Sequence, residues 1–275
     1  RAYAAAPGCR LRWVCDLDAE RASRLARELN TEAGTFEQIL SDPQTRVVSI
    51  ATYDDAHAEQ VVASLRAGKH VFAEKPLCRT RDEFDRIREA ARGRHLSCNL
   101  VLRAAPLYQW LRDAILEGRL GEIYSMDGDY LYGRLHKITD GWRGRVDRYS
   151  VMQGGGVHMV DLMLWLTGSQ PASVSAAANR IATRGTEFQY DDFASATFRF
   201  DSGLIGRITA NFGCVHRHQH VVRVFGTKGT FLYDDQGARF WDSREGTPTK
   251  IDAAPEPAMK ERASARTSAS SRRTG

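Results

Sequence analysis

The chain has 275 residues, of which 42% are hydrophobic and 27% charged, an ordinary globular composition with room for two domains. No apolar run approaches the roughly 18 residues of a membrane-spanning helix, and the N-terminus lacks the apolar core of a signal peptide. The five cysteines form no CxxC pair, which indicates reduced thiols rather than a disulfide framework. The composition therefore predicts a soluble, cytoplasmic protein with no membrane partner.

The formal net charge of +5 is concentrated near the C-terminus. Residues 260–275 hold five basic side chains against the single acid Glu261, a local charge of +4 that leaves about +1 for the rest of the chain. A net charge so close to zero gives no basic surface that would bind a polyanion, so we expect no nucleic-acid partner. The terminal stretch also lacks apolar periodicity, which predicts a disordered basic tail over residues 256–275.

The first hundred residues alternate strand-like and helix-like patterns. Short strands separated by amphipathic helices predict βαβ units, and hence an α/β Rossmann-type parallel sheet in a dinucleotide-binding domain over residues 1–103. Strands are expected at 11–15, 47–51 (fully buried), 70–73 and 95–100, and helices at 18–29, 57–67 and 80–91, the last opened by a capping box from Thr80 to Glu83.

A different pattern follows a helix expected at 106–117. Six β-rich runs joined by tight turns predict an α+β domain over residues 104–255, with a large, mostly antiparallel sheet and one main helix at 157–167. The runs lie at 124–132, 172–178, 193–200, 204–212, 220–225 and 230–233.

A dinucleotide-binding domain should carry GxGxxG after its first strand and, about 20 residues later, an acid for the ribose hydroxyls. Asp16 ends the strand at 11–15, where that acid belongs, although it could be a plain turn former. Only fifteen residues precede it, so the first strand and the glycine loop are expected upstream of this chain. The sheet would then lack its first strand, leaving two strands without a neighbour, and we expect the chain to fold poorly alone or to obtain the missing strand from elsewhere.

The tripeptide Glu74-Lys75-Pro76 closes the strand at 70–73 and places a lysine where ligands bind in open α/β sheets. Its ammonium could orient a hydroxyl or stabilise an oxyanion. The alternative is a solvated lysine before a turn proline.

The run Gly154-Gly155-Gly156 leads into the helix at 157–167, which is apolar on nearly all sides but holds His158, Asp161 and Trp165 on one face. Such a helix is buried, so its imidazole and carboxylate need partners. They could satisfy each other as a core pair. The glycines favour a ligand, because they permit close approach and leave free amides at a helix N-terminus.

These motifs resemble the Gfo/Idh/MocA family of NAD(P)-dependent oxidoreductases. The resemblance covers about residues 2–245 and rests on Thr52 with His57, on Glu74-Lys75-Pro76, on residues 119–123 and on the run from Gly154 to Asp161 with Trp165. It implies a Rossmann domain followed by an open-faced sheet domain that assembles homodimers or homotetramers. It also implies hydride transfer with a sugar, cyclitol or related polyol as the small-molecule substrate.

The resemblance also implies roles for individual residues. Lys75 and His158 would be catalytic, with the lysine beside the nicotinamide and the histidine exchanging a proton with the substrate hydroxyl. Asp161 would orient the imidazole or anchor the helix, and Gly154 stands where many members have an aspartate. NAD is favoured over NADP, because a 2′-phosphate would meet the charge of Asp16. The implied cofactor-binding residues are Asp16, Thr52, His57, Glu74, Lys75, Pro76 and Arg103, and the implied substrate contacts are Lys75, Arg143, Gly155 and His158.

Some signals remain open from the sequence. His216, His218 and His220 would share a face if they lie on a strand, and a zinc site, a substrate or interface contact, or a polar surface would all suit them; no metal is expected. Tyr130 and Tyr132 fit packing better than ligand contact. Besides an enzyme, the chain could be a catalytically silent sugar-binding sensor or an inactive fragment of such an enzyme.

Overall fold

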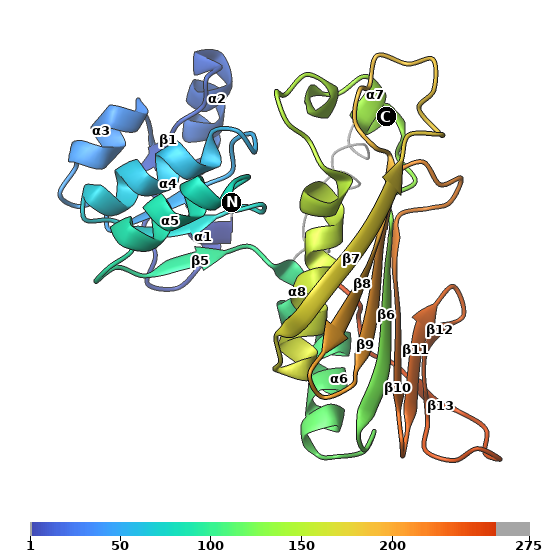
Figure 1. Cartoon of the computed structure of the whole chain (residues 1–275). Helices are drawn as coiled ribbons and strands as arrows, with labels where there is room; N and C mark the ends of the chain where they lie inside the picture. The colour runs from blue at the N-terminus through green and yellow to red at the C-terminus, as the bar shows by residue number, and fades with distance from the viewer. Residues whose placement is uncertain (1, 257–275) are drawn as a thin grey trace, which may run out of the picture. The chain divides into compact units, whose positions relative to one another are not determined.

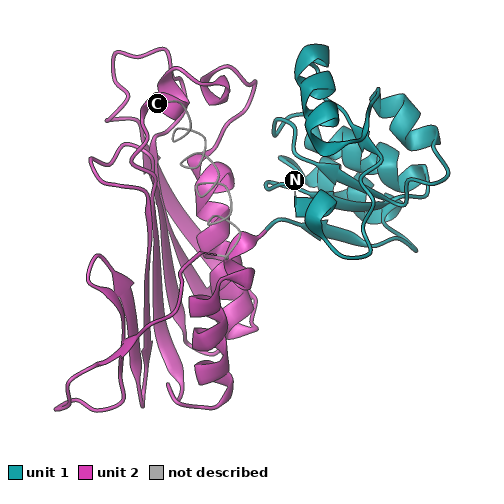
Figure 2. Cartoon of the chain, turned by 180° about the vertical axis from the view of Figure 1, so that it is seen from behind, with its two compact units in different colours: residues 1–99 teal, residues 100–275 magenta. Residues whose placement is uncertain are grey.

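The structure, a computed structural model, describes residues 2–256. It divides the chain after Asn99 into two compact units, residues 1–99 and residues 100–275 (Figure 2). The boundary expected at 103/104 lies at the end of the 3₁₀ helix η1 (Val101–Ala104). The predicted basic tail lies outside the described residues except for Glu256.

Unit 1 contains two separate parallel sheets, β1-β2 and β3-β4-β5, and within the described residues no strand lies between β1 and β3. In the usual 3-2-1-4-5-6 order, the first strand lies between the second and the fourth. The split therefore matches the prediction of a Rossmann-type sheet that lacks its first strand. The strands are β1 (Trp13–Val14), β2 (Glu32–Ala33), β3 (Val47–Ile50), β4 (His70–Ala73) and β5 (Leu96–Cys98).

The prediction that the strand at 47–51 is fully buried was wrong. Val48 and Ile50 are buried in a core cluster with helix α4 (His57–Arg66), whereas Val47 and Ser49 are exposed. The reason is that only one face of β3 packs against α4. A strand of a complete doubly wound sheet is covered on both faces, and here the second face is largely open.

Two helices of unit 1 begin with a capping box. The box at Thr80 and Glu83 is confirmed: the threonine hydroxyl accepts from the Glu83 amide, and the glutamate accepts from the Thr80 amide. A second box at Thr35 and Gln38 opens a helix that we did not predict. The helices are α1 (Ala2–Ala5), α2 (Ala19–Leu29), α3 (Phe36–Ser41), α4 and α5 (Arg81–Ala90).

Unit 2 is built on an eight-stranded sheet of order β13-β12-β11-β10-β6-β9-β8-β7. As predicted it is mostly antiparallel; the exception among the described strands is the parallel pair β6–β9, which α8, β7 and β8 separate in the chain. The last two strands were not predicted. The strands are β6 (Ile123–Leu131), β7 (Pro171–Asn179), β8 (Phe193–Phe200), β9 (Ile205–Asn211), β10 (Gln219–Gly226), β11 (Thr230–Asp234), β12 (Gly237–Trp241) and β13 (Thr249–Ile251).

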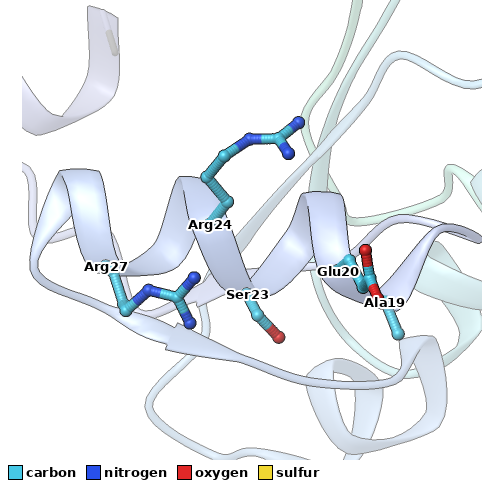
Figure 3. Close-up of a pocket in the computed structure, with 5 residues that line it drawn as sticks. All are labelled: Ala19, Glu20, Ser23, Arg24 and Arg27. Atoms are coloured by element: carbon cyan, nitrogen blue, oxygen red, sulfur yellow. The ribbon is translucent and has the colours of Figure 1, made fainter.

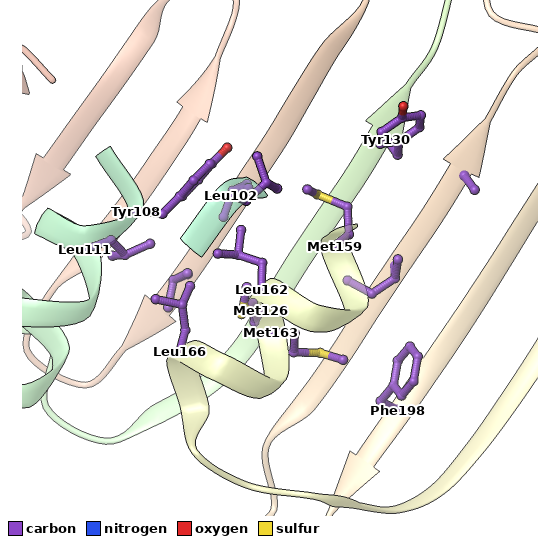
Figure 4. Packing of buried hydrophobic residues seen from close by; sticks show 14 of the residues in the cluster. Leu102, Tyr108, Leu111, Met126, Tyr130, Met159, Leu162, Met163, Leu166 and Phe198 are labelled. Atoms are coloured by element: carbon purple, nitrogen blue, oxygen red, sulfur yellow. The ribbon is translucent and has the colours of Figure 1, made fainter. Parts of the chain in front are cut away.

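Helices α6 (Pro106–Leu116) and α8 (Val157–Thr167) cover one face of this sheet (Figure 1). Met159, Leu162 and Met163 of α8 pack with Met126 of β6 in one core cluster (Figure 4). Burial of each such side chain contributes about 1.5–3 kcal/mol, so this contact fixes α8 on the sheet. The remaining helical segments are α7 (His136–Thr139), the 3₁₀ helix η2 (Trp142–Gly144) and the π-helix η3 (Met152–Gly156).

The other face of the sheet carries a polar ladder across three strands. Arg207 of β9 pairs with Asp127 of β6 at 2.9 Å, and Asp129 of β6 accepts from Thr209 at 2.8 Å and from Arg223 of β10 at 3.0 Å. The alternation of β6, with Met126 on the helix side and these acids on the other, produces the open-faced sheet that the family resemblance implied.

Candidate active site

The segment Glu74-Lys75-Pro76 follows β4 directly. Glu74 is held on both sides: its amide donates to the Ile50 carbonyl of β3 at 2.8 Å, and its carboxylate accepts from the Asn99 side chain at 2.7 Å. Lys75 follows, half-buried, and its peptide bond to Pro76 is cis. The lysine is therefore attached to a fixed backbone at the carboxyl ends of two parallel strands.

His57 joins the loops that follow β3 and β4. Its imidazole is buried, with Nδ1 2.7 Å from the carbonyl oxygen of Pro76 and Nε2 3.1 Å from that of Thr52. The Thr52 hydroxyl in turn donates to Gln60 of α4 at 2.8 Å. The structure thus brings Thr52, His57 and Pro76 together. The His57 imidazole links the loop after β3 to Pro76, the residue that follows Lys75. A direct contact of these residues with a cofactor stays a prediction.

Asp16 lies just beyond β1, the position expected of a ribose-binding acid. One of its oxygens accepts from the Asp18 amide at 3.1 Å, and the other is 3.5 Å from the exposed Arg21. The carboxylate remains partly open to solvent, so the hydroxyls of a ribose could reach it. Asp16 therefore fits the ribose end of a dinucleotide, whereas the sequence contains no glycine loop that would bind the pyrophosphate.

The three glycines lie in η3, which runs directly into α8. They are buried, and a Cβ on Gly155 would lie 2.6 Å from Cδ1 of Tyr130, closer still to Cε1 of the same ring, and 2.8 Å from Cε2 of Phe212. A Cβ on Gly154 would meet Tyr149 just as closely. The prediction that the glycines leave free amides at a helix N-terminus was wrong, because η3 continues directly into α8 and the Gly154 amide donates to the Ser150 carbonyl at 2.8 Å. A substrate contact at Gly155 stays a prediction.

His158 is buried on the sheet side of α8, where its ring stacks on Tyr130 with 6.0 Å between the ring centroids. Tyr130 also contacts Tyr132, Phe212 and two further imidazoles. Burial raises the pKa of the Tyr130 hydroxyl, so it stays neutral at pH 7. The imidazole of His158 thus packs against the aromatic cluster around Tyr130.

Asp161, one turn further along α8, is bound by Arg103 of η1. The guanidinium contacts both carboxylate oxygens, with Nε 2.9 Å from Oδ2. This hydrogen bond raises the pKa of Arg103, because it favours the charged form. Asp161 and His158 therefore do not satisfy each other as a core pair. The pair fixes η1 to α8 and supports the anchoring role of Asp161, whereas cofactor binding by Arg103 stays a prediction.

Arg143 lies in η2, with its guanidinium over the Trp142 ring at 4.6 Å. It is close enough to Tyr130 for its charge to oppose, in part, the effect of burial on the pKa of that hydroxyl. Arg143 and His158 therefore approach the same tyrosine from different segments of unit 2. Its contact with a substrate stays a prediction.

The imidazoles of His216, His218 and His220 do not all lie in the same environment. His216 pairs with Asp235 at 3.0 Å on the surface, whereas His218 and His220 contact Tyr130. Within residues 2–256 no three histidine, cysteine or acidic side chains are grouped as metal ligands would be. The same residues contain no helix of the length and apolarity needed to span a membrane.

A surface depression on unit 1 carries no site. Its lining residues Ala19, Glu20, Ser23, Arg24 and Arg27 all come from α2 (Figure 3), so no second element contributes a facing group.

The folds of the two units are those of the two domains of a nicotinamide-dependent oxidoreductase. Residues 1–100 match the family model described as "Oxidoreductase family, NAD-binding Rossmann fold", and residues 108–232 match the "GFO/IDH/MocA C-terminal domain". The chain therefore belongs to the Gfo/Idh/MocA oxidoreductase family, which confirms the resemblance seen in the sequence.

Two curated relatives illustrate the range of the family. A 1,5-anhydro-D-fructose reductase of Ensifer adhaerens is 32% identical over 78% of this chain and 65% of its own length. A scyllo-inositol 2-dehydrogenase (NAD(+)) of Bacillus subtilis strain 168 is 27% identical over 82% of this chain and 66% of its own length. The chain thus spans slightly less than two thirds of these relatives.

Among solved structures, a levoglucosan dehydrogenase in complex with NADH superposes with a TM-score of 0.79. The match is 22% identical and covers 90% of this chain and 75% of that one. The similarity confirms the fold of the chain.

Proposed function

We propose that this chain transfers a hydride between NAD(P) and a sugar, cyclitol or related polyol. The observation that carries the proposal is that a chain of this family has an amine and an imidazole, each held in place by its surroundings. Lys75 lies at a strand end on a backbone held by hydrogen bonds, and His158 is buried against the aromatic cluster around Tyr130. The similar proteins named above support a sugar or cyclitol as the substrate class.

In the proposed reaction, the Lys75 ammonium donates a hydrogen bond to the substrate hydroxyl and stabilises the developing alkoxide. A ring nitrogen of His158 takes the hydroxyl proton as the carbonyl forms, since a neutral imidazole is a competent base near pH 7. The carbon–hydrogen electron pair leaves as hydride, so the substrate is oxidised; bound nicotinamide supplies the hydride acceptor. In the reverse direction His158 returns the proton. Asp161, held by Arg103, keeps α8 in place.

For the cofactor we propose NAD in preference to NADP. Asp16 would bind the ribose hydroxyls, and its charge disfavours a 2′-phosphate. Thr52, His57, Glu74, Lys75 and Pro76 would border the nicotinamide end, because they cluster where β3 and β4 end.

We further propose a homodimer or homotetramer formed through the open face of the second-unit sheet. The polar ladder from Arg207 to Asp127 and Asp129 lies on the face that α6 and α8 leave uncovered. Light scattering of the purified chain tests this proposal: a monomer at micromolar concentration contradicts it.

A titration with NADH followed by a substrate panel tests the function. Nicotinamide fluorescence should report saturable binding, weakened by Asp16→Ala. Sugars and cyclitols assayed with NAD and NADP should then give turnover with at least one polyol. Binding without turnover would favour the sugar-binding sensor, and the absence of both would favour an inactive fragment.

A further inference from the structure

The segment between β6 and η3 concentrates positive charge beside the aromatic cluster around Tyr130. Residues 134–148 contain two acidic and five basic side chains, a formal charge of +3; the basic residues are Arg134, Lys137, Arg143, Arg145 and Arg148. The described residues 2–256 together carry no net charge, because Arg1 and the local +4 of residues 260–275 account for the +5 of the whole chain. The positive charge of this basic segment is therefore a local feature of unit 2.

Two contacts hold the basic segment against the core of unit 2. A Cβ on Gly144 of η2 would lie 3.7 Å from the Phe188 ring, and the Tyr190 hydroxyl donates to the carbonyl of Val146 at 2.5 Å. Phe188 and Tyr190 both contact Tyr149, whose ring belongs to the same core. The backbone that carries the charges is therefore fixed, and a fixed site loses less conformational entropy when a ligand binds.

Arg134 and Arg143 are the members of this segment whose charge reaches Tyr130. The guanidinium carbon of Arg134 lies 5.6 Å from the centroid of the Tyr132 ring, which stacks on Tyr130 at 6.1 Å. Burial raises the pKa of the Tyr130 hydroxyl, whereas the charges of Arg143 and Arg134 lower it. Since Tyr130 also stacks on His158, the two guanidiniums and the proposed base border the same aromatic cluster.

Neither guanidinium is paired with a carboxylate within the part of the chain that the structure describes. Arg134 is exposed, and Arg143 is half-buried over the Trp142 ring. Asp147, an acid of the same segment, lies instead 3.8 Å from Arg148. A guanidinium presents its N–H donors as a planar fork that fits the oxygens of a carboxylate or a phosphate. The two arginines therefore suit an anion supplied by a ligand.

We propose that the substrate is a sugar or cyclitol that carries an anionic group, a carboxylate or a phosphate, and that Arg134 and Arg143 bind this group while His158 acts on a hydroxyl of the same molecule. The proposal rests on the proposed function and narrows its substrate class. Charge-assisted hydrogen bonds at one end of the substrate would fix the orientation of the reacting hydroxyl at the other.

Calorimetric titration of the full chain with matched sugars tests the proposal and needs no turnover. One set is D-glucose, D-glucuronate and D-glucose 6-phosphate, and a second is myo-inositol with myo-inositol 1-phosphate. A charged member should bind about 10-fold more tightly than its neutral counterpart in at least one set, and added salt should weaken the preference. Preference for glucuronate alone identifies a carboxylate, and preference for the phosphate esters alone identifies a phosphate.

Variants of the basic segment locate the contact. Arg134→Gln and Arg143→Gln should each lower the affinity for the charged sugar by about 3-fold or more, and together they should remove the preference. Arg143→Lys keeps a charge near Trp142 and should retain most of the preference, which separates loss of charge from loss of packing. Arg148→Gln is the matched control, because it removes one charge of the same segment from a side chain that already pairs with Asp147.

The proposal is overturned if no charged member binds more tightly than its neutral counterpart in either set. A preference that survives in the folded double variant, or that Arg148→Gln weakens equally, also overturns it. Tight binding of a charged sugar without turnover would support the anion contact and contradict the proposed function. Turnover of neutral polyols with no preference for charged ones would do the reverse.

Discussion

Replacing Gly155 by alanine tests how tightly η3 is packed against the sheet. The new Cβ would lie 2.6 Å from Cδ1 of Tyr130 and 2.8 Å from Cε2 of Phe212, so the rings or the helix must move by about 1 Å to restore ordinary contact. Tyr130 is 6% exposed and enclosed by other rings, so it cannot swing aside.

Overpacking of this kind costs about 1–3 kcal/mol, and we expect the upper half of that range because both contacts are with rigid rings. The better helix propensity of alanine returns about 1 kcal/mol. The net loss in unfolding free energy should therefore be about 1–2 kcal/mol. A movement of about 1 Å at His158, three residues on, should also lower kcat by 10-fold to about 100-fold.

Urea denaturation followed by tryptophan fluorescence measures the first effect, and steady-state kinetics the second. Gly246→Ala is the matched control, because its Cβ would meet Ser243 at an ordinary 3.4 Å. If Gly155→Ala unfolds at the same urea concentration as the parent and the control, the packing of η3 on Tyr130 is not as described.

Three further predictions follow from single contacts. Arg103→Ala leaves the buried Asp161 carboxylate without its partner and should lower the unfolding free energy by about 1–3 kcal/mol. The loss is smaller than for a fully buried ion pair, because the Arg103 side chain is 47% exposed. Asp161→Asn in the same background should recover part of the loss, whereas losses that add in the double variant would contradict the pairing. Asp16→Ala should weaken NADH binding and narrow the preference for NAD over NADP, measured by fluorescence titration with both; an unchanged preference would remove Asp16 from the site. The Trp13 indole lowers the pKa of Asp42, so this carboxylate contributes stability above its unfolded pKa of about 4 and loses it as pH falls through the lower folded value. Asp42→Asn should therefore weaken the acid dependence of unfolding, and an unaltered pH profile would contradict this reasoning.

Much of the fold could be predicted because its signals are local. The capping box at Thr80 and the strand at 70–73 depend on neighbouring residues, and both were predicted with accurate bounds. The short helix α3 carries an equally local signal, Thr35 with Gln38, which could have been found. Pairings between distant residues could not be predicted in this way. Strands β6 and β9 pair in parallel because the elements between them bring the chain back to the same end of the sheet, and nothing in the sequences of the two strands indicates this pairing.

The candidate site shows the same division. Lys75 and His158 stood out through motifs, whereas the partner of Asp161 is Arg103, 58 residues earlier, and no local pattern joins them. Tyr130 and His220 are 90 positions apart and meet only through the register of β6 with β10. The glycines before His158 were misinterpreted because the sequence shows that space is needed and does not show what fills it.

The central claim is that the Lys75 amine and the His158 imidazole act on the same substrate. Steady-state kinetics of Lys75→Met, His158→Ala and the double variant with NAD and the best polyol test it most directly. We predict that each single change lowers kcat by roughly 10² or more, that the double change is hardly worse than the more damaging single one, and that NADH affinity changes little. Rates near the parent value in either single variant, or losses that simply multiply in the double, would contradict the claim.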